Sequence, residues 1–225
     1  MLKANKSLWF EKIYAVYNRN LFNRRFNSLQ VSGLKFLKVK EEKTPLIIYA
    51  NHSSWWDGLT AFQISRQAGL DSFIMMEEKQ LKKLRLFRKL GAFSVVRENN
   101  REALKSINYA IQILEQNPIR TLWIFPQGEI SPNDARPLRF YNGLARIIKR
   151  LEKCSVISLA MRYEFLGEYK PDIFVKFEKT ELSATDLKRK PQDISDILAV
   201  NLSDNLDELK TEITKGNYSN FEKIR

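Results

Sequence analysis

Short apolar runs alternate with helical patterns along the chain after residue 30. Six runs have the length and composition of buried strands: PLIIYA, DSFIMM, GAFSVV, RTLWIF, SVISLAM and DIFVKFE, which begin at residues 45, 71, 91, 120, 155 and 172. Apolar residues recur at helical spacing over residues 58–69, 100–117, 141–153 and 193–215, and Asn100 is the expected N-cap of the second helix. Strands that alternate with helices predict an α/β fold with a mostly parallel central sheet flanked by helices.

The first 30 residues have a different pattern, in which apolar and aromatic residues are interleaved with cations. The apolar members are Leu8, Trp9, Phe10, Ile13, Tyr14, Val16, Tyr17, Leu21 and Phe22, and the cations are Lys3, Lys6, Lys12, Arg19, Arg24 and Arg25. A basic amphipathic helix can lie in a bilayer interface, but a helix packed on the domain explains the pattern equally well. We therefore predict an amphipathic membrane-associating helical segment over residues 1–30 and a single α/β domain over residues 31–225.

The charge of the chain narrows the classes of partner. The 225 residues carry a formal net charge of +12, and residues 185–225 hold seven Lys or Arg against eight Asp or Glu, so the excess lies in the first 184 residues. Such a charge favours nucleic acid or anionic lipid as a partner. A second basic cluster, residues 79–90, combines six cations with five apolar residues and favours lipid, although most such runs are solvated helix faces.

The cellular location expected for the protein follows from the absence of a membrane-spanning run and of a signal-peptide pattern in the sequence. No apolar run approaches the roughly 18 to 20 residues that a membrane-spanning helix needs, and residues 1–30 do not have the pattern of a signal peptide. Cys154 is the one cysteine, which agrees with a reducing compartment, and its apolar neighbours predict a core residue. We expect a peripheral protein on the cytoplasmic face of a membrane, with no transmembrane helix.

The stretch NHSSWWDG follows the first buried strand and contains His52, the one histidine of the chain, and Asp57. On one helix the two side chains would point about 140° apart, whereas a loop that folds back brings them into hydrogen-bond contact. An aspartate bonded to one imidazole nitrogen leaves the other nitrogen free as a base. The pair predicts activation of a hydroxyl, which a substrate can supply; capping or packing by His52 is the alternative for this motif considered alone.

A second stretch, FPQGEIS, follows the strand RTLWIF and is expected at the same edge of the sheet. Pro126 and Gly128 shape a turn there, and Gln127 and Glu129 are expected to face the cleft with backbone N–H groups. One histidine and one cysteine form a poor ligand set, so no metal site is expected.

These stretches resemble the motifs of the 1-acylglycerol-3-phosphate acyltransferase family, the lysophospholipid acyltransferases. The family's first motif, Asn-His followed by four residues and Asp, is complete at Asn51, His52 and Asp57. The second resembles KQLKKLRLFRKLGAFSVVR, with Lys79 and Arg97 at matching places. The third, usually FPEGTRS, is FPQGEIS, and the fourth corresponds to VISLAMRYEF. All four occur in the family's order over residues 46–165.

The resemblance implies direct transfer of a fatty acyl group from an acyl thioester to a hydroxyl of a lysophospholipid such as 1-acylglycerol-3-phosphate. His52 would be the base, Asp57 would stabilise the imidazolium, and N–H groups near Gly128 or a nearby cation would stabilise the oxyanion. The residues implied to contact substrate are Lys79, Arg97, Phe125, Pro126, Gln127, Gly128 and Glu129. The implied partners are membrane lipids and a donor, acyl-CoA or acyl carrier protein, with no cofactor, metal or nucleic acid.

Two positions of the third motif depart from the family. Ile130 stands where the family has an arginine thought to help hold the acceptor's phosphate, and Gln127 replaces a glutamate. A lysophospholipid is still favoured because Lys79 and Arg97 are present, and a non-phosphate acceptor such as a glycolipid or glycosylated carotenoid is the alternative. A non-catalytic basic module that binds membrane or nucleic acid is a second alternative, supported by the charge alone.

Overall fold

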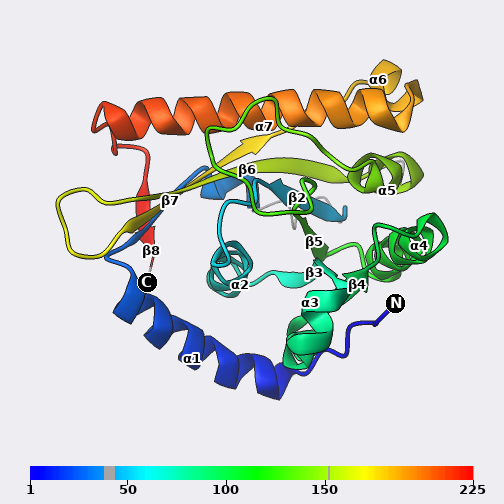
Figure 1. Cartoon of the computed structure of the whole chain (residues 1–225), viewed down its shortest axis with the longest axis horizontal. Helices are drawn as coiled ribbons and strands as arrows, with labels where there is room; N and C mark the ends of the chain where they lie inside the picture. Colours follow the sequence, from blue (N-terminus) through cyan, green and yellow to red (C-terminus); the bar gives the residue numbers. More distant parts are fainter. Residues whose placement is uncertain (38–43, 152, 225) are drawn as a thin grey trace.

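The structure, a computed structural model, describes residues 1–37, 44–151 and 153–224. Glu152, inside the helix predicted over residues 141–153, and Arg225, the last residue of the predicted domain, lie outside the described residues. Helices cover both faces of a central sheet in the described part of the chain (Figure 1).

The sheet has eight strands in the order β4-β3-β5-β2-β6-β7-β1-β8. Their bounds are β1 Leu29–Ser32, β2 Leu46–Ala50, β3 Asp71–Glu77, β4 Ala92–Val95, β5 Arg120–Ile124, β6 Ser155–Glu164, β7 Asp172–Lys179 and β8 Glu222–Ile224. Five pairs are parallel, and the pairs β6–β7 and β1–β8 are antiparallel. The predicted α/β fold with a mostly parallel sheet is confirmed.

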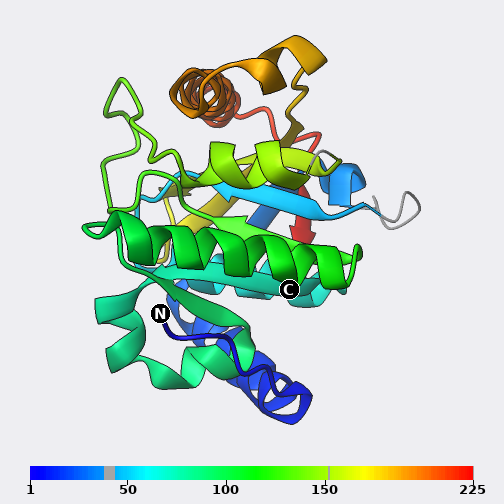
Figure 2. The ribbon, with the colours of Figure 1, turned by 90° about the vertical axis from the view of Figure 1, so that its right-hand side faces the viewer.

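The helices lie on opposite faces of this sheet. They are α1 Leu8–Arg25, α2 Asp57–Gln67, α3 Glu78–Lys83, the 3-10 helix η2 Arg85–Leu90, α4 Asn100–Gln116, α5 Gly143–Leu151, α6 Ala184–Lys188 and α7 Pro191–Thr214. Seen from the side, α7 and α1 lie at opposite ends of the molecule with the sheet between them (Figure 2). Because side chains alternate along a strand, Ile47 and Tyr49 pack with α4, α5 and α7, whereas Ile48 and Ala50 pack toward α1 and α2.

Helix α4 begins one residue away from the predicted cap. The prediction that Asn100 is the N-cap is wrong: Asn99 has the extended backbone of a cap, and its side chain accepts hydrogen bonds from the N–H groups of Arg101 and Glu102. Asn100 is the first helical residue. Two adjacent asparagines have the same capping chemistry, so only the backbone conformation distinguishes them.

The N-terminal segment is held against the domain by backbone hydrogen bonds. Ser94 N–H donates to the carbonyl of Leu2, and Asn5 N–H donates to the carbonyl of Arg88, both at 2.9 Å. The predicted boundary at residue 30 lies inside β1. No helix in the described ranges is both long enough and apolar enough to cross a membrane.

Helix α1 buries two polar side chains beside the core residue Phe22, and it exposes several large apolar residues. Its inner face includes Glu11 and Asn18, and the Asn18 amide donates to the Gln63 side chain of α2 at 3.0 Å. Its exposed large apolar residues are Leu8, Trp9, Ile13, Val16 and Tyr17. The inner face is therefore more polar, and the outer face more apolar, than expected for a helix that only covers a hydrophobic core.

Candidate active site

The loop after β2 folds back and joins His52 to Asp57. His52 Nδ1 lies 2.8 Å from Asp57 Oδ2, which confirms the predicted contact. The same oxygen accepts hydrogen bonds from the N–H groups of Ser53 and Ser54, at 2.7 and 2.9 Å. Asp57 is the first residue of α2, where a carboxylate also interacts favourably with the helix dipole. One carboxylate oxygen therefore joins three groups of this loop.

The second oxygen of Asp57 is bonded from a distant part of the chain. The Tyr163 hydroxyl in β6 donates to Asp57 Oδ1 at 2.7 Å, and the Asp57 side chain is fully buried. An ionised carboxylate only accepts, so His52 Nδ1 carries the shared proton and Nε2 is left as an acceptor. Phe125 stacks on the imidazole with ring centroids 4.8 Å apart. The arrangement can accept a proton from a hydroxyl group.

The loop after β5 is joined to the backbone of His52. Gln127 Oε1 accepts a hydrogen bond from His52 N–H at 2.7 Å, and Ser131 N–H donates to the His52 carbonyl at 2.8 Å. The buried Gln127 side chain therefore points toward the first loop, and not into the cleft as expected. Gly128 N–H donates to the Phe125 carbonyl, so this N–H is already used within the turn.

Gly128 has a backbone conformation that favours glycine, and a side chain there would also displace the Arg97 guanidinium. Its φ is +73°, in the left-handed region, and a Cβ atom there would collide with the Arg97 guanidinium. Arg97 donates to the Gly128 carbonyl, lies 3.8 Å from a Glu77 carboxylate oxygen and stacks over the Tyr141 ring. Arg97 therefore joins the end of β3 to the second loop.

The two loops border a cavity of about 890 Å³ that extends between the sheet and the helices α1, α2 and α4. Its size falls in the range of about 300 to 1,000 Å³ that is usual for ligand pockets. His52 lines the cavity, and so do Arg97, Phe125, Pro126, Gly128 and Glu129. Apolar residues such as Leu59, Phe62 and Ile74 form much of the remaining wall. A chain of methylene groups would be accommodated there.

Lys79 is placed apart from the other predicted residues. It is exposed on α3 and is not among the residues that line the cavity. The structure thus brings Arg97 to the cavity but not Lys79. The two adjacent tryptophans of the first loop have different surroundings. Trp55 is exposed at the cavity wall, whereas Trp56 packs against the rings of Phe22 and Phe26.

The sequence prediction missed a cation at this cavity. Arg146 on α5 lines the cavity and is exposed. Within the described residues its guanidinium has no carboxylate partner, unlike Arg97. Among the same residues, no group of three or more His, Cys, Asp or Glu side chains is placed to hold a metal ion.

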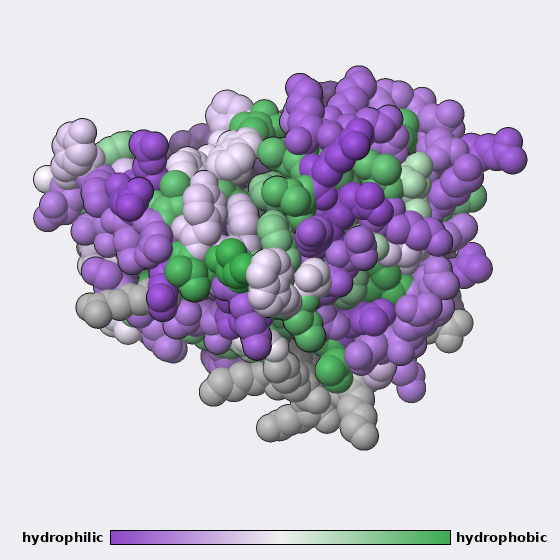
Figure 3. All heavy atoms as spheres, turned by 90° about the horizontal axis from the view of Figure 1, so that it is seen from below, coloured by the Kyte–Doolittle hydropathy of each residue, from purple (hydrophilic) through white to green (hydrophobic). Residues whose placement is uncertain are grey.

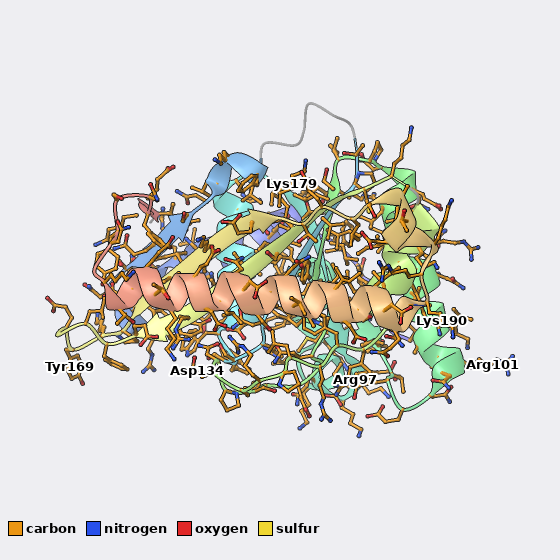
Figure 4. The ribbon with its side chains drawn as sticks, turned by 90° about the horizontal axis from the view of Figure 1, so that it is seen from above. Arg97, Arg101, Asp134, Tyr169, Lys179 and Lys190 are labelled. Atoms are coloured by element: carbon orange, nitrogen blue, oxygen red, sulfur yellow. The ribbon has the colours of Figure 1, made fainter. Side chains whose placement is uncertain are left out.

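The segment that follows the second loop is anchored to α7 and β6. Asp134 accepts from Arg162 of β6 at 2.9 Å and lies 3.2 Å from Lys210 of α7, while Arg136 pairs with Asp207 of α7. Figure 4 shows Asp134 and Arg97 on the same side of α7. These partly exposed ion pairs connect the segment after the second loop to β6 and α7.

Comparison with known proteins assigns the region that contains the two loops to a protein family. The model of the family described as Acyltransferase matches residues 28–162, more than half of the chain, and this range contains both loops. A comparison with curated proteins found no match.

Proposed function

The chain belongs to the acyltransferase family, that of the 1-acylglycerol-3-phosphate acyltransferases, and from this premise we propose that it acylates a hydroxyl of a lysophospholipid. The donor is an acyl thioester, either acyl-CoA or an acyl carrier protein. The observation that carries the proposal is the His52–Asp57 contact of 2.8 Å at the wall of a largely apolar cavity. The cavity takes the acyl chain, and the imidazole takes the acceptor's proton.

The reaction proceeds by direct transfer. His52 Nε2 removes the proton of the acceptor hydroxyl as the oxygen forms a bond to the thioester carbonyl carbon. Asp57 stabilises the imidazolium, and the tetrahedral intermediate then breaks the carbon–sulfur bond. The departing thiolate takes the proton from the imidazolium, so the products are an ester and a free thiol.

An arginine at the cavity is needed to bind the phosphate of a lysophospholipid acceptor. Arg97 is already engaged by the Gly128 carbonyl, Glu77 and Tyr141. Arg146 is exposed at the same cavity and has no carboxylate partner among the described residues. We therefore assign the phosphate contact to Arg146. This residue would do the work of the family's third-motif arginine, whose position is occupied here by Ile130. A neutral glycolipid is the alternative acceptor, for which Arg146 would not be needed.

Membrane association completes the proposal and is supported by α1. Trp9 is 71% exposed and Ile13 is 49% exposed, and cations such as Lys12 and Arg19 are exposed on the same helix. Figure 3 views the molecule from the side of α1 and shows a band of hydrophobic and intermediate residues between hydrophilic ones. Glu11 and Tyr14 of this helix also line the cavity. A lipid surface in contact with α1 would therefore lie close to the binding site.

An acceptor screen tests the function. Purified protein, a labelled long-chain acyl-CoA and host lipid extract are incubated, and new acyl esters are identified by mass spectrometry. We expect acylated lysophospholipid, and we expect His52→Ala to lower the rate by roughly 10² to 10⁴ because general-base catalysis is lost. A folded His52→Ala variant with near-normal turnover would contradict the proposal.

A further inference from the structure

We propose that Tyr163 is a positioning residue for acyl transfer, whose hydroxyl fixes the Asp57 carboxylate in the orientation that aligns His52. This inference rests on the proposed function. Its basis is that the two oxygens of the Asp57 carboxylate accept hydrogen bonds from different groups. Oδ2 accepts from His52 and from two loop N–H groups, whereas Oδ1 accepts from Tyr163 at 2.7 Å.

The Tyr163 hydroxyl is a donor throughout the working pH range. Burial raises the pKa of Tyr163 well above its usual value of 10, and the nearby Asp57 charge raises this pKa further. The phenol therefore keeps its proton. The other polar partner is the Thr60 hydroxyl at 3.4 Å, a longer and weaker contact than the one to Asp57. Because a carboxylate cannot donate, the phenolic proton lies between Tyr163 and Asp57.

The strand that carries Tyr163 is linked to the first loop as well as to β7, where Tyr163 pairs with Ile173. Asn51, directly before His52, accepts from the N–H of Met161 at 2.8 Å and donates to its carbonyl at 3.0 Å. Both bonds are made by the Asn51 side-chain amide, and they link β2 to β6 just beyond the last backbone pair, Ala50 and Leu159. Tyr163 follows Met161 by two residues, so both side chains lie on the same face of the sheet. The loop that carries His52 is thereby connected directly to the strand that carries Tyr163.

A matched control exists in the neighbouring strand. The Tyr49 hydroxyl in β2 bonds to the Thr180 hydroxyl at 2.8 Å, and Tyr49 is fully buried like most of the core. Its side chain lies on the opposite face of the sheet from Tyr163 and does not line the cavity. Phenylalanine at either position removes one buried hydroxyl and preserves the ring. Only the Tyr163 substitution removes a bond to Asp57.

Four variants separate positioning from stability. Tyr163→Phe, Tyr49→Phe, Asp57→Asn and the Asp57→Asn/Tyr163→Phe double variant are assayed with palmitoyl-CoA and 1-acylglycerol-3-phosphate. We expect Tyr163→Phe to lower kcat about tenfold with KM within about twofold, because an interaction with a charged group is lost without loss of substrate contacts. Tyr49→Phe should stay within about twofold. In the Asp57→Asn background, Tyr163→Phe should cause no further loss, because the two residues act as one unit.

A second measurement does not depend on turnover. His52 is the one histidine, so its imidazole nitrogen and Nδ1–H signals in NMR spectra are assigned directly. These signals should move in Tyr163→Phe and remain in place in Tyr49→Phe. Unmoved signals, an equal loss in Tyr49→Phe, or a full additional loss in the Asp57→Asn background would overturn the inference. Failure of the proposed function is a different result, in which the wild type itself transfers no acyl group while the Tyr163 effect on the imidazole signals is still present.

Discussion

At the scale of single residues, we expect Arg97 and Arg146, which line the same cavity, to perform different tasks. Arg146→Ala should raise the KM for a phosphate-bearing acceptor about ten- to a hundredfold, because a charge-assisted contact is lost. Arg97→Ala should lower kcat and the melting temperature, because Arg97 holds the second loop through the Gly128 carbonyl. Steady-state kinetics and thermal unfolding measure both effects.

The control for this pair is Arg101→Ala on α4, since Arg101 is exposed and does not line the cavity. It should leave kcat, KM and the melting temperature near wild-type values. If Arg146→Ala leaves the KM for 1-acylglycerol-3-phosphate unchanged while a sugar-bearing lipid is acylated efficiently, the acceptor is a neutral glycolipid and the phosphate assignment is wrong.

Cys154 has a reactivity that can be predicted at the same scale. Burial raises the pKa of its thiol to about 11. At pH 8 only about one molecule in a thousand is then a thiolate, the form that attacks disulfide reagents. Native protein should react slowly with Ellman's reagent at pH 8, whereas protein in guanidinium chloride should release one equivalent quickly. Rapid labelling of the native protein would show that the thiol is accessible and ionised.

At the scale of elements, the outer face of α1 can be tested without disturbing its inner face. Deleting residues 1–27 would remove Tyr14 from the cavity wall and Phe22 and Phe26 from the core, so loss of binding would be ambiguous. The double substitution Trp9→Ser and Ile13→Ser avoids this. It should weaken co-sedimentation with anionic vesicles about tenfold or more, since two apolar anchors are removed.

The matched control is Val200→Ser on α7, which is 58% exposed on the opposite side of the sheet. This variant should sediment with vesicles like the wild type. Equal binding by all variants would place the lipid-binding surface elsewhere, and residues 79–90 would be the next to test. Within that cluster Leu86 is largely exposed, whereas Leu81 is fully buried.

Elements with a strong local pattern could be predicted, and those without one could not. Helix α7 repeats its apolar residues over 24 residues, and β2 is an uninterrupted apolar run. Strand β1 has only four residues, and β8 has three residues that are mostly exposed, so neither produces a clear alternation. The cluster at residues 79–90 is divided at Leu84 into α3 and η2, a change of backbone conformation that its continuous basic pattern does not indicate.

The same distinction applies to the candidate site. The contact between His52 and Asp57 spans five residues and follows from the length of one loop. The contact between Tyr163 and Asp57 spans 106 residues and depends on β6 lying next to β2, which the order of elements along the chain does not determine. Gln127 illustrates a third case, because its side chain is oriented by a backbone N–H of another loop.

At the scale of the whole molecule, the position of β1 in the sheet has a consequence for synthesis. β1 lies between β7 and β8, so residues 29–32 have no strand partner until residues 172–179 have been translated. We predict that ribosome-bound chains stalled before residue 172 are cut by protease near residues 26–32, whereas completed chains are protected there. Protection in the shorter chains would contradict this. Until translation reaches β7, helix α1 is joined to an unpaired strand. If α1 contacts lipid as proposed, a nascent chain then meets the membrane before its sheet is complete.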